Sequence, residues 1–268
     1  MSEPRSGTVT SADGTTIVFD RRGVGPALIL VGGALNDRTA AATLAGLLEP
    51  SFTTFAFDRR GRGDSGDTAP YAVEREVEDI EALVGEAGGS AFLMGHSSGA
   101  ALVIDTAARI GGVDGIALYE PPYIVDDTRP PIPHDYVTHL DELVARDRRG
   151  DAVEYFMVTG VGVPPEAAAQ MRGAPFWPSL EALAHTLPYD GRVMGLDDAD
   201  RSLPVERWKA VTASALVMDG GASPEWARNA VQAVTDALPH AERRTLPGQT
   251  HEVDPAVLAP VLAGFFGR

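Results

Sequence analysis

Cysteine is absent from the 268-residue chain. Disulfide bonds, thiol nucleophiles and thiolate metal ligands are therefore excluded, whereas the redox compartment is left open. Histidine is also scarce, and the six histidines include no His-x-His or His-x-x-x-His pair. A zinc site built from protein side chains has little support from this pattern, so we expect neither a metal nor a cofactor.

Basic residues are outnumbered, because 22 Lys and Arg against 38 Asp and Glu give a net charge of −16. Such a balance disfavours nucleic acids and anionic membranes as partners. No apolar run approaches the ~18 residues of a membrane span. The polar start Met1-Ser2-Glu3-Pro4 lacks the apolar core of a secretory signal. With 44% hydrophobic residues, the chain is expected to be a cytoplasmic globular protein with a substantial core.

Short apolar runs recur along the chain in the manner of strands buried on both faces. They lie at 26–31, 52–57, 90–94, 115–119 and 214–218, with a last candidate at 242–246. Two further strands are predicted on either side of Asp13-Gly14, a dipeptide typical of a hairpin turn. Helical spacing separates several of these runs. We therefore predict an α/β fold with a mostly parallel sheet of about eight strands flanked by helices.

The helices between the strands are predicted from their apolar faces and their ends. The segment 73–86 has one apolar face and acidic residues on the other. The apolar residues of that face are Val77, Ile80, Leu83 and Val84. Ser223 and Pro224 have the pattern of an N-cap and a first helical residue, and Asp254 that of the N-cap of the last helix.

The alternation of strand and helix stops between residues 121 and 204. This segment is rich in proline and contains no convincing buried strand. We predict that 121–204 forms a helical cap or lid, inserted into an α/β core made of 1–120 and 205–268. Its large apolar residues contact either an apolar part of a substrate or one another. They include Tyr155, Phe156, Met157, Met171, Phe176, Trp177 and Leu180.

The most informative stretch is Gly95-His96-Ser97-Ser98-Gly99, which follows an apolar run and precedes a helical pattern of small residues. A strand, a sharp turn and a helix with serine at the apex form the context that a Gly-x-Ser-x-Gly nucleophile requires. The glycines have a mechanical reason, because the tight turn strains the serine backbone and brings strand and helix nearly into contact. Ser97 is therefore the candidate nucleophile.

The loops after the predicted strands carry the other candidate residues. In a parallel sheet covered on both faces, ligands bind beyond the carboxyl ends of the strands. A serine hydroxyl needs a base to take its proton, and His251 is the candidate. His96 is expected to pack below the turn, and the other histidines to be structural or exposed. The residues expected on this rim are Gly32, Asp58, Ser97, Glu120, Asp219 and His251.

Backbone N–H groups near Ser97 are candidates for an oxyanion hole. Attack on a carbonyl group builds negative charge on its oxygen, which such donors must meet. The N–H of Ser98, at the start of the helix after the turn, is one candidate. The N–H of Gly33 or Ala34, after the run 26–31, is the other.

Several of these stretches together resemble the α/β-hydrolase superfamily. They are Val31-Gly32-Gly33, the Asp-Arg-Arg-Gly-Arg-Gly-Asp-Ser loop at 58–65, the turn at 95–99 and His251. The resemblance covers nearly the whole chain and implies a serine nucleophile, an acid and a late histidine in that order. It does not imply a substrate. Loops like 58–65 are mainly structural in this superfamily, so its arginines are not expected to bind an anion.

The acid is the point at which this chain departs from the family pattern. The resemblance places it a few residues after the seventh core strand, where this chain has Ser223. Glu120 ends the sixth strand, a site from which some members, notably haloalkane dehalogenases, supply their acid. Asp219 ends the seventh strand itself. We favour Glu120 over Asp219, and Asp254 is better explained as a helix cap.

The predicted function is hydrolysis of an ester or related acyl compound through an acyl-enzyme intermediate. Ser97, His251 and Glu120 or Asp219 would form the catalytic triad, and the substrate is expected to be a small molecule with an apolar portion. A lyase, a perhydrolase or a carbon–carbon bond hydrolase on the same scaffold would use the same residues. The unusual acid also leaves a non-catalytic binding protein open. An aspartate-nucleophile dehalogenase or epoxide hydrolase is disfavoured, because the turn carries serine.

Overall fold

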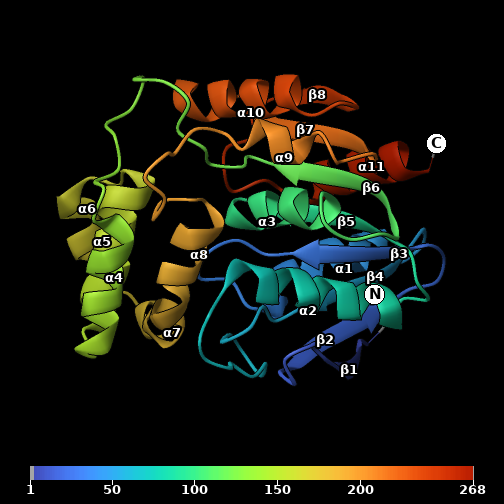
Figure 1. Ribbon diagram of the computed structural model, residues 1–268, viewed down its shortest axis with the longest axis horizontal. Coiled ribbons are helices and arrows are strands. Elements are labelled where there is room, and N and C mark those ends of the chain that lie inside the picture. Colours follow the sequence, from blue (N-terminus) through green and yellow to red (C-terminus); the bar gives the residue numbers. More distant parts are fainter. Residues whose placement is uncertain (1–2, 268) are drawn as a thin grey trace.

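The computed structural model describes residues 3–267, and its strands form one sheet (Figure 1). The strands are β1 (Arg5–Thr10), β2 (Thr16–Arg22), β3 (Ala27–Val31), β4 (Thr53–Phe57), β5 (Ala91–His96), β6 (Val113–Tyr119), β7 (Ser214–Gly220) and β8 (Ala241–Leu246). Their order in the sheet is β1-β2-β4-β3-β5-β6-β7-β8. The hairpin of β1 and β2 is antiparallel, β2 pairs antiparallel with β4, and the remaining neighbours are parallel. The predicted mostly parallel sheet of eight strands is confirmed.

Helices cover both faces of this sheet. One face carries α2 (Val73–Glu86), α3 (Ser98–Ala107) and α10 (Glu225–Ala237), and the other carries α1 (Ala42–Leu48) and α11 (Pro255–Phe266). Side chains alternate along a strand, so Ile29 and Val31 of β3 lie in the first layer whereas Leu28 and Leu30 lie in the second. Both faces of a central strand are therefore buried, which is why the apolar runs are continuous.

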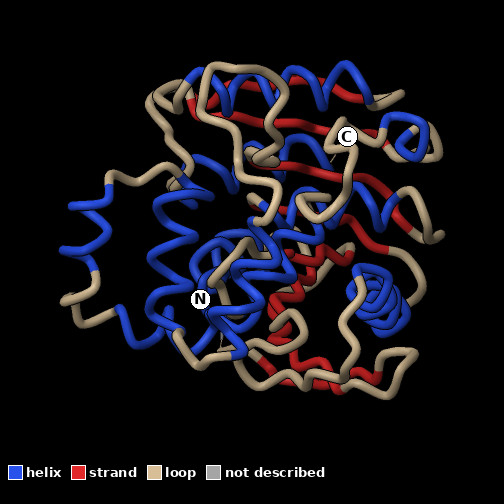
Figure 2. The backbone as a smooth tube through the Cα atoms, turned by 60° about the vertical axis from the view of Figure 1, so that its left-hand side comes forward, coloured by secondary structure: helices blue, strands red, loops and turns tan. Residues whose placement is uncertain are grey.

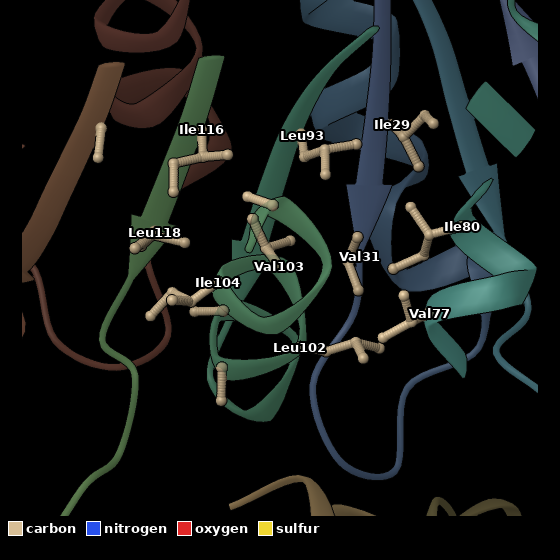
Figure 3. Close-up of a cluster of buried hydrophobic side chains, with 14 of the residues drawn as sticks. Ile29, Val31, Val77, Ile80, Leu93, Leu102, Val103, Ile104, Ile116 and Leu118 are labelled. Atoms are coloured by element: carbon tan, nitrogen blue, oxygen red, sulfur yellow. The ribbon is translucent and has the colours of Figure 1, made fainter. Parts of the chain in front are cut away.

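The core under α3 fixes the element that begins just after Ser97. Every residue of α3 is buried, and each buried Val, Leu or Ile side chain stabilises the fold by roughly 1.5–3 kcal/mol. The start of α3 consequently has little freedom to move. Figure 3 shows the facing side chains: Ile29, Val31, Leu93, Ile116 and Leu118 from strands, Leu102, Val103 and Ile104 from α3, and Val77 and Ile80 from α2.

The prediction that the acidic residues of α2 lie on the face opposite the apolar one is wrong for two of them. Glu76 and Asp79 are 2% and 1% exposed, so they are buried together with the apolar face. Glu76 accepts hydrogen bonds from Arg59, and Asp79 accepts hydrogen bonds from Arg60. An acidic residue avoids the core only when it has no cationic partner there, and here the loop after β4 supplies the partners.

A group of helices lies beyond one end of the sheet, with no strand between the end of β6 and the start of β7 (Figures 1 and 2). We call these the cap helices. They enclose an apolar cluster of their own, which contains Tyr136, Leu140 and Trp177 and also Leu35 from the loop after β3. They are α4 (Tyr136–Ala145), α5 (Arg149–Tyr155), η2 (Phe156–Val161), α6 (Pro165–Met171), α7 (Trp177–Leu183), η3 (Ala184–Thr186) and α8 (Leu187–Val193).

Two short helices complete the fold, η1 (Arg38–Ala41) before α1 and α9 (Val205–Trp208) before β7. The predicted cap of α11 is confirmed, since the Asp254 side chain accepts from the Ala256 N–H. The predicted cap of α10 is wrong. That helix begins at Glu225 with Pro224 in the N-cap position and no side-chain cap, while the Ser223 N–H donates to the Gly220 carbonyl. Within residues 3–267, no helix is long and apolar enough to cross a membrane.

Candidate active site

Ser97 lies at the apex of the turn between β5 and α3, with φ 57° and ψ −126°. A non-glycine residue adopts this backbone conformation only under strain that the surrounding structure must hold. The two glycines are required by space. A Cβ on Gly95 would lie less than 3.0 Å from the Ala100 backbone, and one on Gly99 less than 3.0 Å from the Val31 carbonyl oxygen. The sequence motif thus has the strand-turn-helix context that it predicted.

His251, in the loop after β8, faces Glu120, which follows directly after β6. The His251 Nδ1 lies 2.8 Å from one carboxylate oxygen of Glu120, and the other oxygen accepts from the Gly220 N–H at 2.8 Å. Glu120 is 2% exposed and has φ 45°. Burial opposes its ionisation, but the hydrogen bonds, chiefly that from His251, hold the pKa of Glu120 below its usual value.

Asp219, the other candidate acid, is engaged elsewhere. Its carboxylate pairs with Arg243 at 3.1 and 3.2 Å and accepts from the Thr245 hydroxyl at 3.0 Å. Both partners lie on β8, and Thr245 is the register partner of Asp219. The geometry therefore brings Glu120, rather than Asp219, to His251. Asp254 caps α11, as expected.

The candidate donors of the oxyanion hole lie next to Ser97. A Cβ on Gly33 would be 2.9 Å from the Ser97 Cβ, so the loop after β3 passes directly against the nucleophile. Ser98 is the first residue of α3, and the N–H groups of a first turn have no partner within their own helix. Gly33, Ala34, Ser97 and His251 all line one cavity.

His96 does not pack below the turn, where it was expected. Its Nε2 lies 3.0 Å from the His251 carbonyl oxygen, and the centroids of the two rings are 4.8 Å apart. Because a carbonyl only accepts, the Nε2 of His96 carries the proton. Burial, and next the neighbouring His251, lower the pKa of His96 to about 4. His96 is therefore neutral near pH 7, and it holds the backbone of the loop that carries His251.

Tyr119 is a residue of the site that the sequence did not reveal. Its hydroxyl donates to the Thr250 carbonyl at 2.5 Å, next to His251. The only available signal was its position, at the end of the strand that leads into Glu120. Tyr119 and His96 thus hold consecutive carbonyls of the loop that carries His251.

Two cavities meet at Ser97. One is about 390 Å³ and extends past the loop after β3 and His251, and the other is about 230 Å³ and extends under α4 and α8. Ser97, Ala34 and Phe156 line both. Of the apolar cap residues noted in the sequence, Phe156, Met157 and Leu180 line the larger cavity, whereas Trp177 lies in the cluster between the cap helices.

The charged loop at 58–65 is structural, as expected. Its three arginines are no more than 2% exposed, and each is paired with carboxylates. Arg59 pairs with Glu76 and with Asp190 of α8, and Arg62 pairs with Asp190. Asp190 was not predicted to have any role, because nothing in its local sequence distinguishes it from a surface acid.

The comparisons with known proteins agree with this architecture. Residues 27–261 match the model of a family described as the alpha/beta hydrolase family. A solved structure of an alpha/beta hydrolase from Sphaerobacter thermophilus is 55% identical, with a TM-score of 0.91 over 97% of this chain and all of that one.

Two curated relatives are also similar to the chain. A 2-(acetamidomethylene)succinate hydrolase from Mesorhizobium japonicum is 26% identical over 93% of this chain and 91% of its own length. An N-formylmaleamate deformylase from Pseudomonas putida is 35% identical over 46% of this chain and 47% of its own. Together with the family match over 27–261, these similarities show that the chain belongs to the alpha/beta hydrolase family and is a hydrolase-type enzyme.

Proposed function

We propose that the protein hydrolyses an ester or related acyl compound through an acyl-enzyme intermediate formed on Ser97. The observation that carries the proposal is the hydrogen bond between His251 Nδ1 and the buried Glu120, beside a serine on a strained turn in the same cavity wall. The names of the two relatives, an acetamido hydrolase and a deformylase, describe acyl groups on nitrogen. They support an amide as an alternative to an ester.

In the first half of the reaction, the Ser97 Oγ attacks the carbonyl carbon while His251 Nε2 takes the hydroxyl proton. Glu120 accepts from Nδ1–H, which fixes the tautomer of the ring and stabilises its positive charge. The carbonyl oxygen becomes an oxyanion between the N–H of Ser98 and that of Gly33 or Ala34. The intermediate then expels the leaving group, which receives the proton from His251.

In the second half, water attacks the acyl group on Ser97. His251 Nε2 takes a proton from the water, and the same N–H groups hold the second oxyanion. Collapse of this intermediate breaks the bond to Ser97, whose oxygen recovers the proton from His251, and releases a carboxylic acid. The two cavities that meet at Ser97 provide separate spaces for the acyl group and the leaving group.

The binding-protein alternative rested on a missing acid at position 223. The hydrogen bond between Glu120 and His251 supplies an acid from another strand, which favours catalysis. We also propose that residues 121–204 act as a cap on the core formed by 1–120 and 205–268. The apolar residues Phe156, Met157 and Leu180 on the cavity wall support a small-molecule substrate with an apolar portion.

The test combines labelling with turnover. A fluorophosphonate should attach to Ser97, located by peptide mass spectrometry, and p-nitrophenyl acetate should be hydrolysed. Ser97→Ala should abolish both signals. Ser214→Ala is the matched control, because Ser214 is exposed and begins β7 at the opposite end of the sheet. Absence of labelling in the folded wild-type protein, or turnover that survives in Ser97→Ala, would contradict the proposal.

A further inference from the structure

We propose that Asp190 of the cap helices, held by Arg59 and Arg62, is a positioning residue that sets the oxyanion hole from both sides. The inference rests on the proposed function. It concerns residues that do not touch the reacting atoms, and Asp190 also lines the smaller of the two cavities at Ser97. The buried cluster that carries it consists of Arg59, Arg62, Glu76 and Asp190.

The first side of the hole is fixed through Ser98. The Ser98 Oγ donates to the Asp190 carboxylate at 2.7 Å, so the side chain of the residue whose N–H is a candidate donor is tied to the cap. Both oxygens of Asp190 accept from the Arg62 Nη2, at 2.8 and 2.9 Å, and one of them also accepts from the Arg59 Nη1 at 2.8 Å. Hydrogen bonds to a charged partner are the strong ones, and this carboxylate has little freedom to turn.

The second side of the hole is fixed through the loop after β3. Arg62 donates to the Gly33 carbonyl at 2.5 Å, and Arg59 donates to the Gly32 carbonyl at 3.3 Å. A peptide unit is planar and trans, so its C=O and N–H point in opposite directions. Holding the Gly33 carbonyl therefore aims the Ala34 N–H, and holding the Gly32 carbonyl aims the Gly33 N–H.

The charges of the cluster balance, which makes such an arrangement stable away from water. Glu76 accepts from Arg59 at 2.6 and 2.8 Å, so two cations face two carboxylates. Burial opposes ionisation of Asp190, but Arg62 and Arg59 hold the pKa of Asp190 below its usual value. Asp190 thus stays charged at neutral pH. Because it belongs to α8, the hole is complete only while that cap helix is seated on the core.

The experiment compares Ser98→Ala and Asp190→Asn with Asp79→Asn. Asp79 forms an equally buried pair with Arg60 of the same loop at 2.8 and 2.9 Å, with exposures of 1% and 0%, and neither residue lines the cavities at Ser97. Two quantities are measured for each variant on an ester that the wild-type protein hydrolyses. The first is the effect on kcat and KM, determined separately. The second is the affinity for a trifluoromethyl ketone with the same acyl chain, because its adduct with Ser97 places an oxyanion in the hole.

We expect Ser98→Ala and Asp190→Asn each to lower kcat about tenfold or more, with KM within about twofold, because the hole acts in the transition state. The affinity for the ketone should fall by the same factor. The double variant should be little worse than Asp190→Asn, because Ser98 and Asp190 act on the hole through the same hydrogen bond. Asp79→Asn should melt at a lower temperature and keep the wild-type kcat.

Unchanged kcat and ketone affinity in folded Ser98→Ala would overturn the inference, as would an equal loss in Asp79→Asn. Ser98→Ala changes no charge, so it keeps the test decisive if Asp190→Asn does not fold. Failure of the proposed function is a different result, since wild-type protein would then show no labelling at Ser97 and no turnover that depends on it.

Discussion

Glu120→Gln is the change that separates the proposed triad most sharply from its alternatives. The carboxylate accepts two hydrogen bonds, one from His251 Nδ1 and one from the Gly220 N–H. A glutamine amide of the same shape has one acceptor and one donor, so it can serve only one of these partners.

Either orientation of the amide is costly. If the amide NH₂ faces His251, then Nδ1 must accept, the ring proton moves to Nε2, and the base can no longer take the Ser97 proton. If the amide oxygen faces His251, the buried Gly220 N–H loses its acceptor, which costs about 1–3 kcal/mol, and the imidazolium loses its counter-charge. Replacing the acid of such a triad by its amide lowers kcat roughly 10⁴-fold, which corresponds to about 5 kcal/mol in the activation free energy.

The assay is kcat for p-nitrophenyl acetate from pH 5 to 9, with Asp219→Asn as the matched control. Asp219 is fully buried and ion-paired with Arg243, so its amide variant should lose stability while keeping kcat within about threefold. We expect a loss of roughly 10³–10⁴-fold in Glu120→Gln with a near-native melting temperature. If Glu120→Gln stayed within tenfold of wild type, or if Asp219→Asn were the slower enzyme, the reasoning about the acid would be refuted.

The remaining predictions concern the turn and its neighbours. Folding lowers the pKa of His96 from 6.5 to about 4. As the pH falls, His96 is therefore protonated in the unfolded chain before it is protonated in the folded one. The free energy of unfolding should therefore drop by about 2 kcal/mol from pH 7.5 to pH 5. His96→Gln should remove this part of the pH dependence, as measured by urea unfolding at each pH. A slope unchanged in the variant would contradict this. Gly99→Ala should destabilise the protein by several kcal/mol, of the order found for overpacked cores, because the new Cβ meets the Val31 carbonyl oxygen. In Gly264→Ala, the new Cβ in α11 has nothing within 4 Å, so this change should instead stabilise the protein by about 0.5–1 kcal/mol. If the two variants and the wild-type protein melted at the same temperature, both predictions would be contradicted.

The sheet could be predicted from the sequence because its signals are local. A continuous apolar run as short as that of β3 is typical of a strand buried on both faces. The turn at Ser97 is equally local, since the two glycines, the serine and the helix that follows are adjacent in the chain. Local signals also gave α2 its correct bounds, Val73–Glu86.

The choice between Glu120 and Asp219 depends on side-chain direction, which is not a local property of either residue. Asp219 lies within β7, so its side chain stands on one face of the sheet beside Arg243 and Thr245 of β8. Glu120 lies one residue beyond β6, where a φ of 45° turns the chain and brings the carboxylate to His251. Both residues end a strand in the sequence, and only the backbone path distinguishes them.

The buried cluster shows why the rest of the site could not be read from the chain. Arg62 and Asp190 are 128 positions apart, and each belongs to a residue type that is mostly exposed to solvent. The sequence predicted a structural role for the three arginines of the loop at 58–65 but not their buried partners, and the acids on α2 suggested a solvent face. The arginines and the acids are buried only because each group supplies the partners of the other. A charge whose partner comes from a distant element carries no signal in its own neighbourhood. Ion pairs that join two parts of a fold are therefore the features that sequence patterns miss, and in this protein one such pair lies directly behind the proposed oxyanion hole.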